Sequence, residues 1–239
     1  MIQACDVHGR TAYRRDDLPE VSGAEPPMPL KCYPETYRRM VLPRPRVLPD
    51  GSLWEAVARR RSSRSFAAGP LSGEDLFLLL WASQGITQPG RTPLRATPSA
   101  GATYPIETYL AVRGVEGLRP GLYHWQLPDE QLVVLAEDPA IGRRVVSACM
   151  DQSMCAEAAC TFLWTAVFAR TTARYGERGL RYVYLEAGHV GQSLLLAAAG
   201  LGLASCTIGA LFDGEVNDLL GVDGCEESII YAAAVGRPR

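Results

Sequence analysis

The stretch ARYGERGLRYVYLEAGHVGQSLLLAAAG, residues 173–200, is the most informative about the fold of this 239-residue chain. Its apolar residues recur at the helical period, which predicts one helix of about 25 residues ending near Gly200–Gly202. Tyr182, Glu186 and His189 fall on the opposite side and run into sequence that is apolar all round, so we expect them to line a boundary rather than open water. The predicted core-facing stripe consists of Leu180, Val183, Tyr184, Ala187, Val190, Gly191, Leu194, Leu195 and Ala198.

Apolar segments on either side of this helix have the length and the β-branched and aromatic content of buried strands. Capping-box spacings that begin at Ser52 and Ser72 predict two earlier helices, the second running to about Ile86. We expect a further helix over 139–158 and a loop over 87–105. Because helices and strands are interspersed without strict alternation, the class is α+β. The predicted strands are 107–113, 121–126, 131–137, 159–169, 204–211 and 228–236.

The first 50 residues differ in composition from the rest of the chain. Segments such as LPEVSGAEPPMPLKCYPE and VLPRPRVLPDG are rich in proline and charge, which is typical of extended chain with little regular structure. We therefore divide the sequence into a Pro-rich N-terminal arm, residues 1–50, and one domain, residues 51–239.

Composition excludes several classes of protein. The net charge of −2 provides no basic field for nucleic acid. Seven cysteines without a C-x-x-C spacing indicate neither a disulfide framework nor a zinc site, so we expect reduced thiols, no metal and a cytoplasmic protein. No run of 18 apolar residues predicts a membrane span, and the first residues lack the apolar core of a signal peptide.

Two motifs are candidates for anion binding. Arg59–Arg60–Arg61–Ser62–Ser63–Arg64 follows a predicted helix; such a cluster either complements the negative end of the helix dipole or binds a phosphate. The loop PSAGATYP, 98–105, and the strand end TIGA, 207–210, are built of small residues, which form an ordinary turn or let the backbone approach a ligand. No G-x-G-x-x-G, P-loop or G-x-S-x-G motif is present.

Taken in order, these motifs resemble those of a known family. RRRSSRSF, LWASQGI, PSAGATYP, GLYHW, RYGERGLRYVYLEAGHVGQ, GLGLASCTIGALFD and a last strand ending in AVG are similar to the FMN-dependent nitroreductase superfamily, and most closely to its SagB-type branch of azoline oxidases. The resemblance covers residues 54–237. It implies a central, mostly antiparallel sheet flanked by helices, and a homodimer with FMN bound at the subunit interface.

The resemblance also implies which residues bind FMN. The basic-serine motif would hold the phosphate and ribityl side, the small-residue loop would contact FMN from one subunit, and the strand end would offer backbone amides to the flavin ring. An arginine at the C-terminal end would reach the phosphate. Carried over to this sequence, the residues are Arg60, Arg61, Ser62 and Arg64; Pro98, Ser99, Ala100 and Gly101; Ile208, Gly209 and Ala210; and Arg237, with Arg239 as the alternative C-terminal arginine.

The catalytic pair differs from the pattern of the resembling branch. Azoline oxidases carry a Lys–Tyr pair before GERG, and this chain has Arg174–Tyr175. Arginine stays protonated in proteins and is a poor base, whereas Tyr175 can transfer a proton if Arg174 lowers its pKa.

The resemblance implies oxidation of an azoline in a peptide natural product, by hydride transfer to FMN with O2 as the final acceptor. The alternatives are desaturation of another peptide, NAD(P)H-driven reduction of a nitro or enone compound, and a catalytically silent scaffold subunit. The expected partners are a second copy of the chain, a peptide-derived substrate, and a cyclodehydratase or carrier protein, with neither nucleic acid nor membrane.

Overall fold

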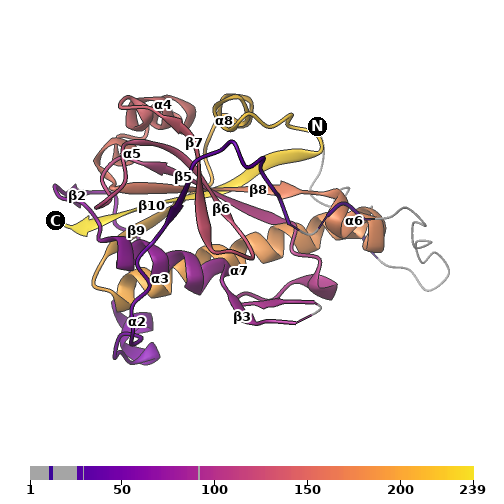
Figure 1. Ribbon diagram of the computed structural model, residues 1–239, viewed down its shortest axis with the longest axis horizontal. Coiled ribbons are helices and arrows are strands. Elements are labelled where there is room, and N and C mark those ends of the chain that lie inside the picture. Colours follow the sequence, from indigo (N-terminus) through magenta and orange to yellow (C-terminus); the bar gives the residue numbers. More distant parts are fainter. Residues whose placement is uncertain (1–10, 13–25, 29, 91) are drawn as a thin grey trace.

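One antiparallel sheet runs through the molecule, with helices on both of its faces (Figure 1). The computed structural model describes residues 11–12, 26–28, 30–90 and 92–239. The strand order is β1-β7-β6-β5-β8-β10-β2, and β9 also pairs with β10. This is the α+β arrangement predicted from the sequence. The strands are β1 (Arg39–Val41), β2 (Phe66–Ala67), β5 (Ile106–Val112), β6 (Gly121–Gln126), β7 (Gln131–Glu137), β8 (Cys160–Val167), β9 (Ala204–Ile208) and β10 (Glu227–Pro238).

The helices divide between the two faces of this sheet. In Figure 1, α3 and α7 run below the sheet, and α4, α5 and α8 lie above it. Each face has its own apolar core, in which β5, β6 and β8 are buried along almost their whole length. The helices are α2 (Leu53–Arg59), α3 (Gly73–Gln84), α4 (Ile141–Ala148), α5 (Met154–Glu157), α6 (Ala169–Tyr175), α7 (Gly179–Gly200) and α8 (Asp213–Leu220), with short 3-10 turns η1 (Ala100–Ala102) and η2 (Gly176–Arg178).

Helix α7 crosses the sheet at close range because small residues face each other. Ala233 of β10 is fully buried in the core cluster that also contains Val190 and Leu194 of α7. On α7, a Cβ added to Gly191 would come within 2.9 Å of the ring of Tyr231 on the same strand. A larger residue at either place would push helix and sheet apart, so these small residues determine the position of α7.

Three predicted elements were wrong in their boundaries. The helix of 173–200 is interrupted at Gly176, whose φ of 56° breaks it into α6 and α7. The helix expected over 139–158 is two helices, because Met150 and Asp151 both adopt left-handed backbone. The loop expected over 87–105 contains most of a small hairpin of β3 (Ile86–Gln88) and β4 (Leu94–Arg95).

The predicted stripe of α7 was correct in its centre and wrong at two positions. Val183, Ala187 and Val190 are buried, as expected. Leu180 and Tyr184, at the margin of the stripe, are exposed within one chain, and Tyr184 is 58% exposed. Glu186, placed on the polar side, is buried and only 3% exposed.

Part of the predicted N-terminal arm belongs to the sheet. Residues 39–41 form β1, which pairs with β7 so that Arg39 lies opposite Val133. Within the described part of 1–50, the carbonyl of Met28 accepts a hydrogen bond from Arg170 Nε at 2.8 Å. The remainder of the arm prediction, on 1–10, 13–25 and 29, falls outside the described residues.

Candidate functional site

The basic-serine motif lies beside the first residues of β9. Arg60 follows the last turn of α2, and the chain then runs parallel to β9, with Ser62 opposite Ser205. The amide of Ser63 donates to the Ser205 carbonyl at 2.9 Å. This bridge fixes the motif to the sheet, although the motif itself forms no strand.

A pocket of about 300 Å³ opens between this motif and the end of α7. It brings together two residues predicted to bind phosphate, Arg60 and Arg61, with Ser63, Ser65 and the C-terminal Arg239. Arginine guanidinium and serine hydroxyl groups are suitable donors for a phosphate.

The other predicted residues of this group, Ser62, Arg64 and Arg237, are not among the residues lining that pocket. Ser62 and Arg64 are exposed beside it. Arg237 pairs with β2, and its Nε donates to the Pro70 carbonyl at 2.9 Å. The C-terminal arginine in the pocket is therefore Arg239.

The small-residue loop and the Arg174–Tyr175 pair meet each other. Arg174 Nη1 donates to the Gly101 carbonyl at 3.2 Å. Gly101 has a φ of 60°, and a Cβ added there would lie 2.5 Å from Tyr175 Oη and 2.7 Å from Arg174 Nη1. Thr103 and Thr171 hydroxyls, 2.8 Å apart, join the same loop to α6. Glycine at 101 is thus required both by its backbone conformation and by the close approach of the pair.

A second pocket of about 290 Å³ lies between this loop and the first half of α7. Pro98, Ser99 and Ala100 line one side, and Tyr182, Leu185, Glu186 and His189 line the other. Burial raises the pKa of the Glu186 carboxyl to about 7, while a hydrogen bond from Ser99 and the positive charge of Arg95 lower it only in part.

The third predicted group, Ile208–Gly209–Ala210, ends β9. Ile208 is buried and paired with Ala232, and Gly209 and Ala210 are exposed. The Ala210 carbonyl accepts a hydrogen bond from Gln152 Nε2 at 2.8 Å. The strand end is therefore held in place from the α4–α5 connection while its last residues face solvent.

Within one chain the predicted residues that line these two pockets lie at two places along α7. The pocket of Arg60 and Arg61 is lined on the α7 side by residues from Ala199 onward, and the second pocket is lined by α7 residues only up to His189. Ten helical residues, at about 1.5 Å each, place the two sets about 15 Å apart along the helix axis. Figure 1 shows α7 extending beneath the sheet between them.

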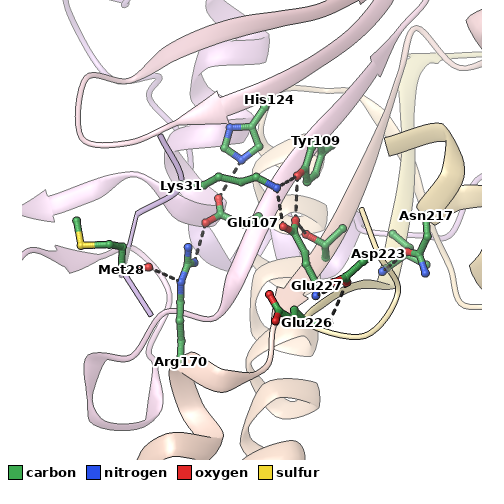
Figure 2. A network of polar contacts seen from close by, with 12 residues as sticks. Met28, Lys31, Glu107, Tyr109, His124, Arg170, Asn217, Asp223, Glu226 and Glu227 are labelled. Carbon is green, nitrogen blue, oxygen red and sulfur yellow. Dashed lines mark hydrogen bonds and ion pairs between the residues drawn. The ribbon is translucent and has the colours of Figure 1, made fainter. Parts of the chain in front are cut away.

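Sequence reasoning missed a buried polar network on the sheet (Figure 2). The Glu107 carboxylate is 2.9 Å from His124 Nε2 and 2.7 Å from Arg170 Nη1. Burial by itself raises the pKa of Glu107, but the hydrogen bond and charge of His124, with the charges of Arg170 and Arg95, outweigh it and lower the pKa to about 2. The three residues come from β5, β6 and α6, which have no common sequence motif.

Polar contacts on the same part of the sheet also hold the N-terminal segment at Lys31. Lys31, the only lysine of the chain, reaches Glu227 and the Tyr109 hydroxyl, both at 2.5 Å. Glu227 also accepts hydrogen bonds from Tyr109 and from Thr165 Oγ1 at 2.6 Å. Figure 2 shows Lys31 lying across the sheet between the two carboxylates Glu107 and Glu227. A buried charge left alone is costly, so this lysine anchors the segment rather than facing a ligand.

Over the part of the chain that the structure describes, no three His, Cys, Asp or Glu side chains group as a metal site. None of the described helices is both long and apolar enough to cross a membrane. The six described cysteines are unpaired, four of them buried.

The protein thus has an α+β fold with one pocket lined by arginine and serine side chains. Residues 57–237 match the model of the nitroreductase family, and the chain belongs to that family. A nitroreductase-named protein of Methanocaldococcus jannaschii, MJ1384, is 36% identical over 77% of this chain and 90% of its own length.

A second relative is the trifolitoxin-processing protein TfxB of Rhizobium leguminosarum bv. trifolii. It is 29% identical over 60% of this chain, which spans only 39% of that protein.

Solved structures agree on the fold. A nitroreductase-named structure from Anabaena variabilis superposes with a TM-score of 0.76 at 27% identity, over 98% of this chain and 46% of that chain. The E. coli microcin synthetase McbBCD complex with truncated pro-MccB17 bound has a chain with a TM-score of 0.65 at 21% identity, covering 84% of this chain and 78% of that one. A structure from Desulfovibrio desulfuricans that is named as a nitroreductase in complex with FMN has a TM-score of 0.54 at 21% identity. The match covers 80% of this chain and 88% of that chain.

Proposed function

We propose that this chain is an FMN-dependent oxidoreductase that oxidises azoline rings of a peptide to azoles, with O2 as the final acceptor. Membership of the nitroreductase family supports the flavin. The names of two similar proteins, a trifolitoxin-processing protein and a microcin synthetase complex with a pro-peptide bound, support a peptide substrate.

The observation that carries the proposal is the separation of the predicted cofactor residues into two sets along α7. One set, with Arg60, Arg61 and Arg239, fits a phosphate. The other, Pro98–Ala100, lies about 15 Å away along the helix, by its rise per residue. A second copy of the chain, placed against α7 by a two-fold axis, would bring the loop of one protomer to the arginines of the other.

Exposed apolar side chains support such a homodimer. Trp54 on α2 is 79% exposed, and Leu185 on α7 is 60% exposed. Leu53, Val57, Leu180 and Tyr184 add further exposed apolar surface on the same two helices, which pack against each other. The side chains of α2 lie near the C-terminal end of α7, beside Ala197 and Gly200, and those of α7 lie in its first half. Exposed apolar surface of this kind is typical of an interface.

FMN, when bound, supplies the hydride acceptor, while the protein supplies binding, orientation and electrostatics. Arg60 and Arg61 would hold its phosphate. The Arg174 guanidinium, fixed to the Gly101 carbonyl, would stabilise negative charge that develops on the substrate. Tyr175, which lies beside the same glycine, is the proposed hydroxyl group that passes a proton between the substrate and a base of the site.

Arg174 also favours a second candidate, NAD(P)H-driven reduction of a nitro or enone compound on the same flavin. A guanidinium stabilises negative charge on a substrate without accepting a proton. In that case the enzyme would leave azolines unchanged.

The test is to purify the protein and record its absorption spectrum and its melting temperature with added FMN. We expect a yellow protein, a melting temperature raised by FMN, and loss of two hydrogens per ring from a synthetic thiazoline peptide in the presence of O2. A colourless protein with an unchanged melting temperature would leave only the silent-scaffold reading. Unchanged thiazoline with NADPH oxidation would favour the second candidate.

A further inference from the structure

Glu186 is a buried carboxyl group whose hydrogen bonding is incomplete. It is 3% exposed, and among the described residues its Oε1 atom has no hydrogen-bond partner. Burying a carboxylate oxygen without a partner is costly, and such a group is retained where it serves a purpose. Glu186 lines the pocket of about 290 Å³ beside Pro98, Ser99 and Ala100.

The groups around Glu186 favour exchange of a proton with a ligand in that pocket. Ser99 Oγ accepts from the Tyr104 amide at 2.9 Å, which leaves its own proton for Glu186. Arg95, next to Tyr104, contributes a positive charge. Tyr182 and His189 line the same pocket from α7. Because burial outweighs the hydrogen bond and the charge, the pKa of Glu186 rises to about 7, and both forms exist at neutral pH.

The loop 98–101 joins Glu186 to the Arg174–Tyr175 pair. Ser99, at one end of the loop, contacts Glu186, and Gly101, at the other end, contacts Arg174 and Tyr175. Arg174 cannot accept a proton at neutral pH. We propose that Glu186 is the proton acceptor of this pocket, taking the proton that a substrate releases as a hydride leaves it. This inference rests on the proposed function.

One C–H bond of the substrate breaks and its electron pair leaves as hydride, for which oxidised FMN, when bound, would be the acceptor. A neighbouring C–H or N–H bond breaks, and its electron pair forms the new double bond. The proton goes to the Glu186 carboxylate, which becomes a neutral carboxylic acid and later returns the proton to solvent. The substrate thus loses two electrons and two hydrogens.

The experiment compares the FMN-loaded wild type with Glu186→Gln, which keeps the shape of the side chain and removes the exchangeable proton. Glu74→Gln, at an exposed carboxylate in the first turn of α3, is the matched control. Turnover of the thiazoline peptide is measured against pH. Infrared titration of the protonated carboxyl band gives a second readout, without substrate. Ser99→Ala is a second variant, because loss of a hydrogen bond that lowers the pKa moves the titration of Glu186 to higher pH.

We expect kcat/KM of Glu186→Gln to fall roughly 100-fold. We also expect its pH profile to lose the limb near neutral pH that the wild type shows. The infrared band that titrates near neutral pH should disappear in Glu186→Gln, persist in Glu74→Gln, and move upward in Ser99→Ala. Flavin-loaded Glu186→Gln with the wild-type rate and pH profile would overturn this inference alone, as would a limb that Ser99→Ala leaves unmoved. A wild type that holds no flavin or leaves the peptide unchanged would overturn the proposed function and this inference with it.

Discussion

Arg174 donates a hydrogen bond from Nη1 to the carbonyl oxygen of Gly101 across 3.2 Å, which joins α6 to the small-residue loop 98–101. The two residues are 73 positions apart in the chain. Their contact places the predicted catalytic pair and part of the predicted cofactor site in one locality, although the sequence shows them as separate motifs.

Arg174→Ala removes this hydrogen bond. We expect kcat/KM to fall roughly tenfold, because a hydrogen bond from a charged donor is worth about 1.5 kcal/mol when it is partly solvated. Arg174→Lys retains a cationic donor and should remain closer to the wild type. Steady-state kinetics of the three proteins checks this. Equal rates for Arg174→Ala and the wild type would show that the contact has no role in the reaction.

Gly101→Ala places a Cβ 2.5 Å from Tyr175 Oη and forces alanine into left-handed backbone. We expect loss of flavin retention and activity. Gly117→Ala is the matched control, because Gly117 has a φ of +78° and open space around its Cβ position. It incurs the backbone strain, of order 1 kcal/mol, without the collision. A Gly101→Ala protein that behaves like Gly117→Ala in flavin content would contradict the assigned close contact.

Replacing Arg60 and Arg61 together with alanine should weaken FMN binding more than riboflavin binding. Riboflavin has no phosphate, so it gains nothing from charge-assisted hydrogen bonds to these arginines. Fluorescence titration with the two flavins gives both dissociation constants. Arg143→Ala, at an exposed position on α4, is the control. If the two flavins lose affinity equally, the pocket of Arg60 and Arg61 is not the phosphate site.

Glu186 should make stability fall as pH rises. Its pKa is about 7 in the folded protein and 4.5 as the reference, so between these values the folded state binds more protons than the unfolded state. Stability then decreases with pH across this window, by up to about 3 kcal/mol, and is constant above it. Urea unfolding of wild type and Glu186→Gln at a series of pH values checks this. The difference in unfolding free energy between them should shrink as pH rises; a difference independent of pH refutes the shifted pKa.

Leu185→Glu introduces a charge into the exposed apolar surface of α7. We expect a monomer by sedimentation and a loss of bound flavin, because a buried unpaired charge is costly in an interface. Val47→Glu is the control, since Val47 is also exposed and apolar but lies outside both α2 and α7. A Leu185→Glu protein that remains dimeric would show that the interface lies outside this surface of α7.

Periodicity and motif order predicted the α+β class, and the motifs named several residues that line two pockets of the structure, whose role stays a prediction. The core of α7 was predictable because Val183, Ala187 and Val190 follow the helical period. The break at Gly176 was not, because a glycine inside a helical pattern is compatible with both continuation and interruption.

Two features of the site depend on tertiary structure that periodicity does not report. Glu186 looked like part of a polar face, and it is buried because the loop carrying Ser99 covers it. The network of Glu107, His124 and Arg170 unites residues from three elements, each of which resembles an ordinary strand or helix residue in isolation.

Mixed dimers test most directly the central claim that the flavin site is shared between protomers. One variant carries Arg60→Ala with Arg61→Ala and the other carries Gly101→Ala; each alone should retain little flavin. If the site takes its arginines from one protomer and its loop from the other, co-expression restores one intact site in each mixed dimer. We predict that flavin absorbance and thiazoline oxidation return in the mixed population. Mixed dimers that stay colourless, although each variant folds and dimerises, would contradict the shared site.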